Sequence, residues 1–241
     1  MNRSVQFGEG LFETIRWRSP EEKLKLHYRR LRNSADFLGM GCPSYEEFLE
    51  LIYAHTKSSE NKAVKFLLLS TGSDVYYSES AGYEVKVVVK DMPPKPERVE
   101  LTFSSLRRHS QNPLWRHKSL NFLFNIFVKR EATRRGFFDA IVLNEREHIT
   151  ECSASNIILL RGDRLYAPAR ESGLLWGTTL EFLRIKGADI REEFLSVRDV
   201  LGADSVFVCN SLMGVVPVAR VEGTSIPVDE DVLKALKEIY T

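Results

Sequence analysis

The chain has 241 residues, of which 43% are hydrophobic and 28% are charged, an ordinary balance for a globular protein with a substantial core. Its 34 basic and 33 acidic residues leave a formal net charge of +1, which argues against a dedicated nucleic-acid binder because such proteins rely on an excess of Lys and Arg. No segment is apolar for long enough to predict a signal peptide or a membrane span.

The three cysteines lie far apart and do not have the spacing of metal ligands; they are Cys42, Cys152 and Cys209. Reduced thiols are the simplest interpretation of such a pattern. We therefore expect a cytoplasmic protein without a metal site, which contacts neither nucleic acid nor membrane.

The first third of the chain predicts a strand, two helices and two strands, over residues 11–17, 27–38, 44–57, 64–71 and 83–90. The strands show alternating or continuous apolar runs, and the helices show apolar residues at helical spacing. Ser44 and Glu47 have the spacing of a capping box at the start of the second helix.

The run DMPPKPE, residues 91–97, interrupts this pattern, because its prolines fit neither a helix nor a central strand. One more strand is expected over 100–108, followed by a helix from Ser119 to about Arg135. The rest reads as short strands with a helix near Gly177 and another from Asp229; the strands are expected over residues 138–144, 148–152, 156–162, 164–169, 205–211 and 214–221.

This order of elements predicts an α+β fold with antiparallel strands and segregated helices. We expect two domains, a smaller N-terminal α/β domain over residues 1–110 and a larger C-terminal domain over 111–241. The larger domain should contain mostly antiparallel strands with flanking helices.

Two charged residues stand out by their position. Lys118, in HKSLNFLFN, directly precedes the predicted helix, and Glu151, in ITECSASN, precedes a strand that looks buried. A desolvated lysine can become a reactive amine, whereas a surface lysine would cover apolar residues with its stem. A buried glutamate would need a partner, whereas an edge-strand glutamate would face water.

Two further segments carry small polar residues where the chain turns. GLLWGTTLEFL, residues 173–183, opens a helix with glycine and threonines, and CNSLMGVVPV, residues 209–218, turns between two strands. A helix N-terminus of this kind suits a phosphate, although capping and turn chemistry alone also explain both segments. A nucleophilic lysine, a buried acid and two such turns together favour pyridoxal 5′-phosphate as the ligand.

Six motifs, in order along nearly the whole chain, resemble signatures of the fold-type IV pyridoxal-phosphate enzymes: GEGLFETIR, HYRRLRNSA, KSLNFLFN, ITECSASN, LLWGTT and CNSLMGVVPV. That family contains branched-chain aminotransferases, D-amino-acid aminotransferases and 4-amino-4-deoxychorismate lyases. The resemblance implies a fold like that of the D-amino-acid aminotransferases, a pyridoxal 5′-phosphate cofactor, a small-molecule substrate and a homodimer.

By that resemblance Lys118 is the Schiff-base lysine and Glu151 pairs with the pyridine nitrogen, so both are expected to be catalytic. Arg30 lies in a His-x-x-Arg-Leu pattern and would hold the phosphate. Further cofactor contacts are expected from Asn156, Thr178, Thr179 and Ser211. Substrate contacts are expected from Arg108 and Leu212, with a surface position as the alternative for Arg108.

Within the family the motifs most resemble the lyase, which eliminates pyruvate to give 4-aminobenzoate. TECSASN and CNSLM look like lyase versions, and Phe12 and Phe122 stand about where the aminotransferases carry tyrosines near the cofactor. The alternatives are a branched-chain or D-amino-acid aminotransferase, and a relative that keeps the fold without catalysis. Three features depart from the family pattern. GEGLFET comes almost at the start of the chain, and Leu180 replaces an arginine common after the phosphate turn of aminotransferases. The loop TGSDVYYSES lacks the glycine- and arginine-rich pattern of many lyases.

Overall fold

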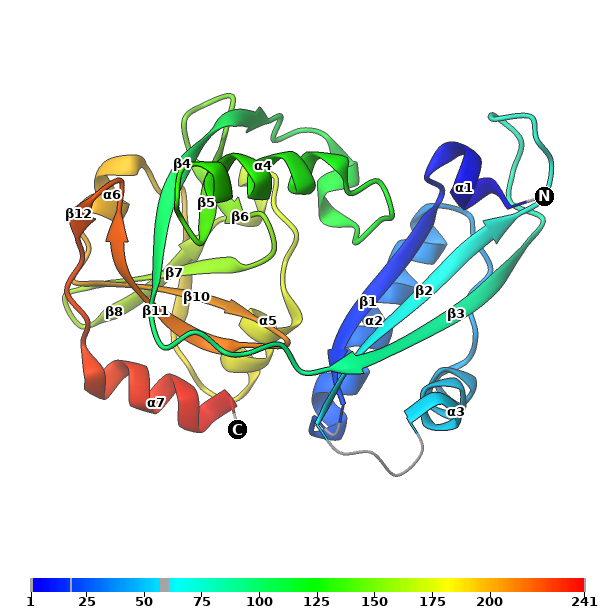
Figure 1. Ribbon diagram of the computed structural model, residues 1–241, viewed down its shortest axis with the longest axis horizontal. Coiled ribbons are helices and arrows are strands. Elements are labelled where there is room, and N and C mark those ends of the chain that lie inside the picture. The colour runs from blue at the N-terminus through cyan, green and yellow to red at the C-terminus, as the bar shows by residue number, and fades with distance from the viewer. Residues whose placement is uncertain (1, 18, 57–60, 241) are drawn as a thin grey trace. The chain divides into compact units, whose positions relative to one another are not determined.

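The computed structural model describes residues 2–17, 19–56 and 61–240. Two units are distinguished, coloured along the chain in Figure 1: unit 1 is Met1–Pro94 with His117–Phe122, and unit 2 is Lys95–Arg116 with Leu123–Thr241. Domains over 1–110 and 111–241 stay a prediction, from which these units differ in two ways. Residues 95–110 belong to unit 2, and His117–Phe122 returns to unit 1.

Unit 1 contains an antiparallel sheet in the order β1-β2-β3, formed by Gly10–Arg16, Lys62–Thr71 and Gly82–Asp91. Helices α2 (Glu21–Phe37) and α3 (Tyr45–Thr56) pack on it (Figure 1). The strands alternate, so Leu11 and Ile15 share a core with Phe48 and Ile52 of α3. Glu13 has the same parity as Leu11 and Ile15 and is therefore directed toward this core.

The segment His117–Phe122 lies beside β1 without forming a helix, and Ser119 forms an isolated antiparallel bridge with Leu11. The Phe12 amide donates to the Lys118 carbonyl over 2.9 Å, and the Leu120 amide donates to the Gly10 carbonyl over 2.8 Å. The predicted helix start at Ser119 is therefore wrong, and α4 spans Leu123–Arg134. The residues before it satisfy their backbone groups on a strand instead of in a first helical turn.

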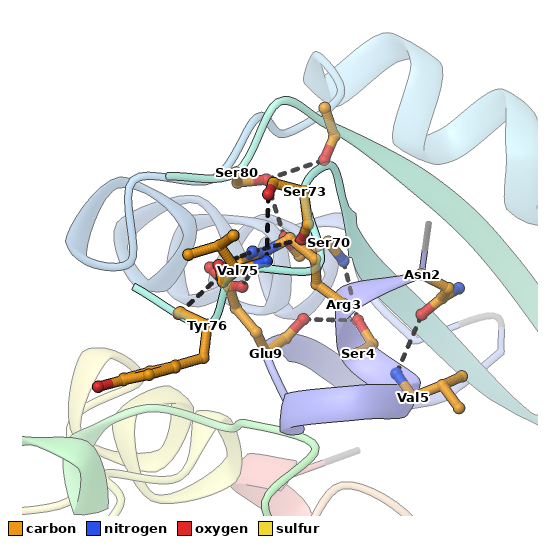
Figure 2. A network of polar contacts seen from close by, with 11 residues as sticks. Asn2, Arg3, Ser4, Val5, Glu9, Ser70, Ser73, Val75, Tyr76 and Ser80 are labelled. Carbon is orange, nitrogen blue, oxygen red and sulfur yellow. Dashed lines mark hydrogen bonds and ion pairs between the residues drawn. The ribbon is translucent and has the colours of Figure 1, made fainter. Parts of the chain in front are cut away.

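The N-terminal helix α1 (Arg3–Phe7) connects to the loop between β2 and β3 through one buried side chain, as Figure 2 shows. Arg3 is 1% exposed and donates to the Glu9 carboxylate over 2.5 Å. It also donates to three loop carbonyls, those of Ser73, Val75 and Tyr76. Sequence analysis did not predict this helix or its role in holding the loop.

Unit 2 contains a mixed sheet in the order β6-β5-β4-β11-β10-β7-β8-β9, with β12 paired to β11. Neighbouring strands are antiparallel except in the pairs β4–β11, β4–β5 and β8–β9. The strands β4 to β12 span Val99–Arg108, Asp139–Asn144, Ile149–Cys152, Asn156–Arg161, Arg164–Pro168, Ile190–Glu193, Ser205–Asn210, Gly214–Val221 and Thr224–Ser225.

The helices of unit 2 cover its sheet with apolar faces. Helices α5 (Thr178–Ile185) and α7 (Glu230–Tyr240) share a core with β7 and β10, while α4 packs on β5. The α+β prediction is confirmed, although β9 and helix α6 (Val197–Leu201) were not foreseen. None of the helices formed by the described residues combines the length and the apolar character needed to cross a bilayer.

Candidate active site

In unit 1, Arg30 belongs to a buried polar cluster with Glu13 and His27. Arg30 donates from Nε to Glu13 Oε1 over 2.8 Å and from Nη2 to Oε2 over 2.6 Å. His27 Nδ1 lies 2.6 Å from the same Oε2. The cluster forms because Glu13 is directed toward α2, while His27 and Arg30 lie three residues apart on that helix and so share a face.

The charges in this cluster are set by burial and pairing. Burial raises the pKa of Glu13, but the Arg30 charge and the hydrogen bonds from His27 and Arg30 outweigh it and lower that pKa to about 2. Burial lowers the pKa of His27 below its ordinary value, and the charges of Arg30 and Lys118 act in the same direction. At neutral pH the cluster therefore holds an anionic Glu13 beside a neutral His27.

Lys118 also belongs to unit 1, where its backbone is paired with β1. Its Nζ lies 4.5 Å from the centroid of the Phe12 ring and 5.9 Å from that of Phe122. The two rings meet edge to face, with centroids 5.3 Å apart. An amine beside two aromatic rings is partly removed from water, which is the surrounding that a nucleophilic lysine requires.

In unit 2, Glu151 lies on β6 and forms an ion pair with Arg108, the last residue of β4. Both residues are buried, and the Arg108 guanidinium lies 4.8 Å from the Trp115 ring centroid and 5.2 Å from that of Phe124. The alternative that Arg108 has a surface position is therefore wrong. Aromatic rings on the guanidinium and a charged partner at its end hold Arg108 in one orientation.

The remaining oxygen contacts of Glu151 link it to the chain before α5. The Leu175 amide donates to Oε1 over 3.1 Å, and Asn156 Nδ2 donates to Oε2 over 3.3 Å. Asn156 also donates to the Leu175 carbonyl over 2.9 Å. The structure thus brings together three of the predicted residues, Glu151, Asn156 and Arg108, within unit 2.

The N-terminus of α5 lies directly after this group. Its N-cap, Gly177, carries no side chain, and a Cβ there would lie only 1.9 Å from Asn156 Oδ1. Thr178 and Thr179 are buried in the first turn. Glycine is therefore required by the close approach of Asn156, and the backbone amides of the first turn are left without a side-chain cap.

The turn between β10 and β11 contains Ser211 and Leu212. Asn210 Oδ1 accepts hydrogen bonds from the amides of Leu212 and Met213, and Tyr240 of α7 donates to the Ser211 carbonyl over 2.8 Å. The backbone of the turn is therefore held by Asn210 at the end of β10 and by Tyr240 of α7. The cofactor role of Ser211 and the substrate role of Leu212 stay predictions.

Sequence reasoning quoted the motifs that contain Glu13 and His27 but did not single out either residue. The signal was present, since Glu13 stands between Leu11 and Ile15 at a spacing of two and therefore shares their face of the predicted strand. An acid at such a position needs a buried partner. The aromatic surroundings of Arg108 had no comparable signal, because Trp115 and Phe124 come together only in the folded chain.

The chain is similar to known proteins over nearly its whole length. It is 26% identical over 251 residues to an aminodeoxychorismate lyase from Vibrio harveyi, covering 99% of this chain and 92% of the relative. It is 26% identical over 249 residues to a D-alanine aminotransferase from Listeria monocytogenes, covering 93% and 82%.

Solved structures agree with this. A Legionella pneumophila protein provisionally named 4-amino-4-deoxychorismate lyase superposes with a TM-score of 0.91 at 27% identity, over 99% of this chain and 92% of that one. A branched-chain amino acid aminotransferase from Escherichia coli, at 23% identity, shares the fold with a TM-score of 0.85, over 99% and 85% of the two chains. The family model of amino-transferase class IV matches residues 10–221. The chain therefore belongs to the class IV aminotransferase family.

Proposed function

We propose that this enzyme is a pyridoxal-phosphate-dependent lyase that eliminates pyruvate from 4-amino-4-deoxychorismate and leaves 4-aminobenzoate, a step of folate biosynthesis. The supporting observation is that two Glu–Arg pairs expose opposite partners. In unit 1 the Arg30 side chain is 15% exposed and that of Glu13 is 0% exposed. In unit 2 the Arg108 side chain is 2% exposed and that of Glu151 is 9% exposed.

Each pair is suited to one charged group of the cofactor. The pair in unit 1 presents its cation, which suits a phosphate, and the pair in unit 2 presents its anion, which suits a protonated ring nitrogen. When bound, pyridoxal 5′-phosphate supplies an aldehyde that condenses with amines and a ring that accepts electrons from the bound substrate.

Each cofactor-binding residue then has a defined task. Arg30 would bind the phosphate with its guanidinium. Thr178 and Thr179 would offer the cofactor the first turn of α5, where the helix dipole favours an anion. Glu151 keeps the ring nitrogen protonated, because a carboxylate beside that nitrogen stabilises its positive form. Asn156 and Ser211 add polar contacts.

Lys118 moves the protons. Its Nζ would hold the cofactor through the aldehyde and would be free to act as a base once the substrate is bound. The freed Nζ then removes the proton from the substrate carbon that bears this amino group, as a positioned general base. Breakage of the bond to the enolpyruvyl oxygen leaves an aromatic ring, and Nζ returns a proton to the departing fragment, which becomes pyruvate.

The rings beside Lys118 favour the lyase over an aminotransferase. Phe12 and Phe122, about where the aminotransferases carry tyrosines, both lie against its amine and neither has a hydroxyl. A proton shuttle by Lys118 alone is sufficient for elimination. The similarity to lyases over 99% of the chain supports the same choice.

Arg108 receives a positioning role in this proposal. It orients Glu151 through their ion pair and is itself held by Trp115 and Phe124. Contact of Arg108 with a substrate carboxylate, expected from the sequence, stays a prediction. We further expect a homodimer in the cytoplasm, and the three free cysteines fit a reducing compartment.

The direct test is to supply 4-amino-4-deoxychorismate to the cofactor-loaded protein without any keto acid. We expect equal amounts of pyruvate and 4-aminobenzoate, quantified by a coupled lactate dehydrogenase assay and by fluorescence. A folded, loaded sample that forms neither product would contradict the proposal.

The similarity to D-alanine and branched-chain aminotransferases supports a second candidate function, transfer of an amino group to a keto acid. It predicts that D-alanine or a branched-chain amino acid alone bleaches the yellow colour of the loaded protein. For the lyase, we expect neither donor to change the colour on the time scale of pyruvate formation.

A further inference from the structure

The roles given above leave one buried polar feature of unit 1 unexplained, the pairing of Glu13 with His27 behind Arg30. Glu13 is fully buried and His27 is 3% exposed. Burying a carboxylate and an imidazole together is unfavourable unless both are well paired. An arginine does not need these two neighbours to attract an anion, so their pairing calls for another explanation.

The contacts show what the two neighbours do. Arg30 meets Glu13 through Nε and Nη2 on both carboxylate oxygens, a side-on arrangement that fixes the plane of the guanidinium. His27 Nδ1 also lies 2.6 Å from Glu13 Oε2, so the carboxylate cannot rotate without losing that contact. Glu13 holds Arg30, and His27 holds Glu13.

The protonation states are consistent with this chain of contacts. The charged groups that shift the pKa of His27 include Glu13 from β1, Arg30 from its own helix and Lys118 from the segment beside β1. Burial and the two cations lower the pKa of His27, and Glu13 stays anionic because its pKa is about 2. A neutral His27 must donate its Nδ1 proton to Glu13, since an ionised carboxylate can only accept.

We propose that Glu13 and His27 are positioning residues, which hold the Arg30 guanidinium in one orientation so that it selects a phosphate-bearing cofactor over its dephosphorylated form. The inference rests on the proposed function in that Arg30 is taken to bind the phosphate. It assigns phosphate selectivity to Glu13, which contacts Arg30, and to His27, which contacts Glu13.

The test compares the dissociation constants of pyridoxal 5′-phosphate and pyridoxal for the apo-protein, by quenching of protein fluorescence. The wild type should prefer the phosphorylated form. Glu13→Gln should reduce that preference about tenfold, the effect expected when a charged hydrogen-bond partner is lost. Affinity for pyridoxal should stay unchanged, because pyridoxal has no phosphate for Arg30 to bind.

Two substitutions at His27 separate positioning from packing. His27→Phe keeps a ring but cannot donate a proton, so it should reduce the preference about threefold or more. His27→Asn can donate an amide proton from the place of Nδ1 and should restore the wild-type ratio. A merely structural role for His27 would lower the affinity for both ligands together and would not be rescued by Asn.

The matched control is Glu9→Gln, which weakens the pair that the buried Arg3 forms with Glu9 in unit 1. It should lower the melting temperature and leave the ratio of the two dissociation constants unchanged. Arg30 Nε–H detected by NMR gives a readout without ligand: we expect a protected signal in the wild type and rapid exchange in Glu13→Gln.

The outcomes distinguish the two proposals. A wild type that does not prefer pyridoxal 5′-phosphate over pyridoxal would overturn the phosphate role of Arg30 and with it the proposed function. A wild type with that preference, retained in a folded Glu13→Gln protein, would overturn the positioning role alone.

Discussion

Both units pair a glutamate with an arginine, but each unit buries the opposite partner more deeply. In unit 1, Glu13 lies among the core residues of its strand and Arg30 extends from helix α2 toward the surface. In unit 2, Arg108 is covered by Trp115 and Phe124, and Glu151 is the more exposed partner. The same chemical pair can therefore present either sign of charge, depending on which partner the apolar groups cover.

This difference matters because a paired charge is largely neutralised in its own surroundings. An ion pair in a low-dielectric interior attracts a further ion mainly through the edge of the group that remains accessible. The arginine is therefore the more exposed partner in unit 1, which suits an anion, and the glutamate is the more exposed partner in unit 2, which suits a cation. Four predictions test that assignment, beginning with Lys118, whose loss should have the largest effect.

Lys118→Ala should lower the turnover number at least about a thousandfold, because the general base and the amine are lost together. Product formation and the yellow absorbance band of the loaded protein measure the effect. Lys65→Ala is the matched control, since Lys65 Nζ also lies 4.5 Å from the Phe12 ring centroid. Equal losses in the two variants would remove the special role of Lys118.

Glu151→Gln should lower the turnover number about a hundredfold, because a neutral amide no longer stabilises the protonated ring nitrogen. The preference for pyridoxal 5′-phosphate over pyridoxal should stay unchanged. Glu13→Gln should show the reverse, with a reduced preference and a smaller change in turnover under saturating cofactor. A shared pattern in the two variants would break the distinction between the pairs.

Removing either arginine should destabilise the fold, as an unpaired buried carboxylate costs about 3 kcal/mol or more. Arg30→Met should cost more than Arg108→Met, because Glu13 is 0% exposed whereas Glu151 is 9% exposed. Urea unfolding of the apo-proteins measures both. The opposite ranking would mean that the exposed fractions do not decide how strongly each carboxylate depends on its arginine.

Acid should destabilise unit 1 in two steps. The pKa of His27 is lowered by burial, so the unfolded chain binds a proton more readily and stability falls as the pH drops below about 6.5. The pKa of Glu13 falls from 4.5 to about 2, so the stability from its ionised form is present above 4.5 and is lost toward 2. Thermal unfolding across pH should therefore be flatter for the folded double variant Glu13→Gln with His27→Asn.

Much of the fold followed from local patterns. The alternation of apolar residues predicted β1, and the helical spacing of Leu31 and Ala35 predicted the later half of α2. The start of α4 was predicted four residues too early, at Ser119 in place of Leu123. Propensity favoured a helix there, but pairing of Lys118 and Leu120 with β1 satisfied the same backbone groups.

Lys118, Glu151 and the glycine-threonine helix start were singled out together from the sequence, and their roles came from the resemblance to the family. Their partners could not be found that way. Glu13 on β1 meets His27 and Arg30 on helix α2, and Arg108 on β4 meets Glu151 on β6.

The sequence by itself determined the family, the α+β class and the identity of the charged groups, since these depend on residue types in order. Only the tertiary structure decided which carboxylate meets which arginine and which member of each pair stays accessible. The physical reason is that solvation of a charge depends on what packs around it, and packing brings together residues from separate elements.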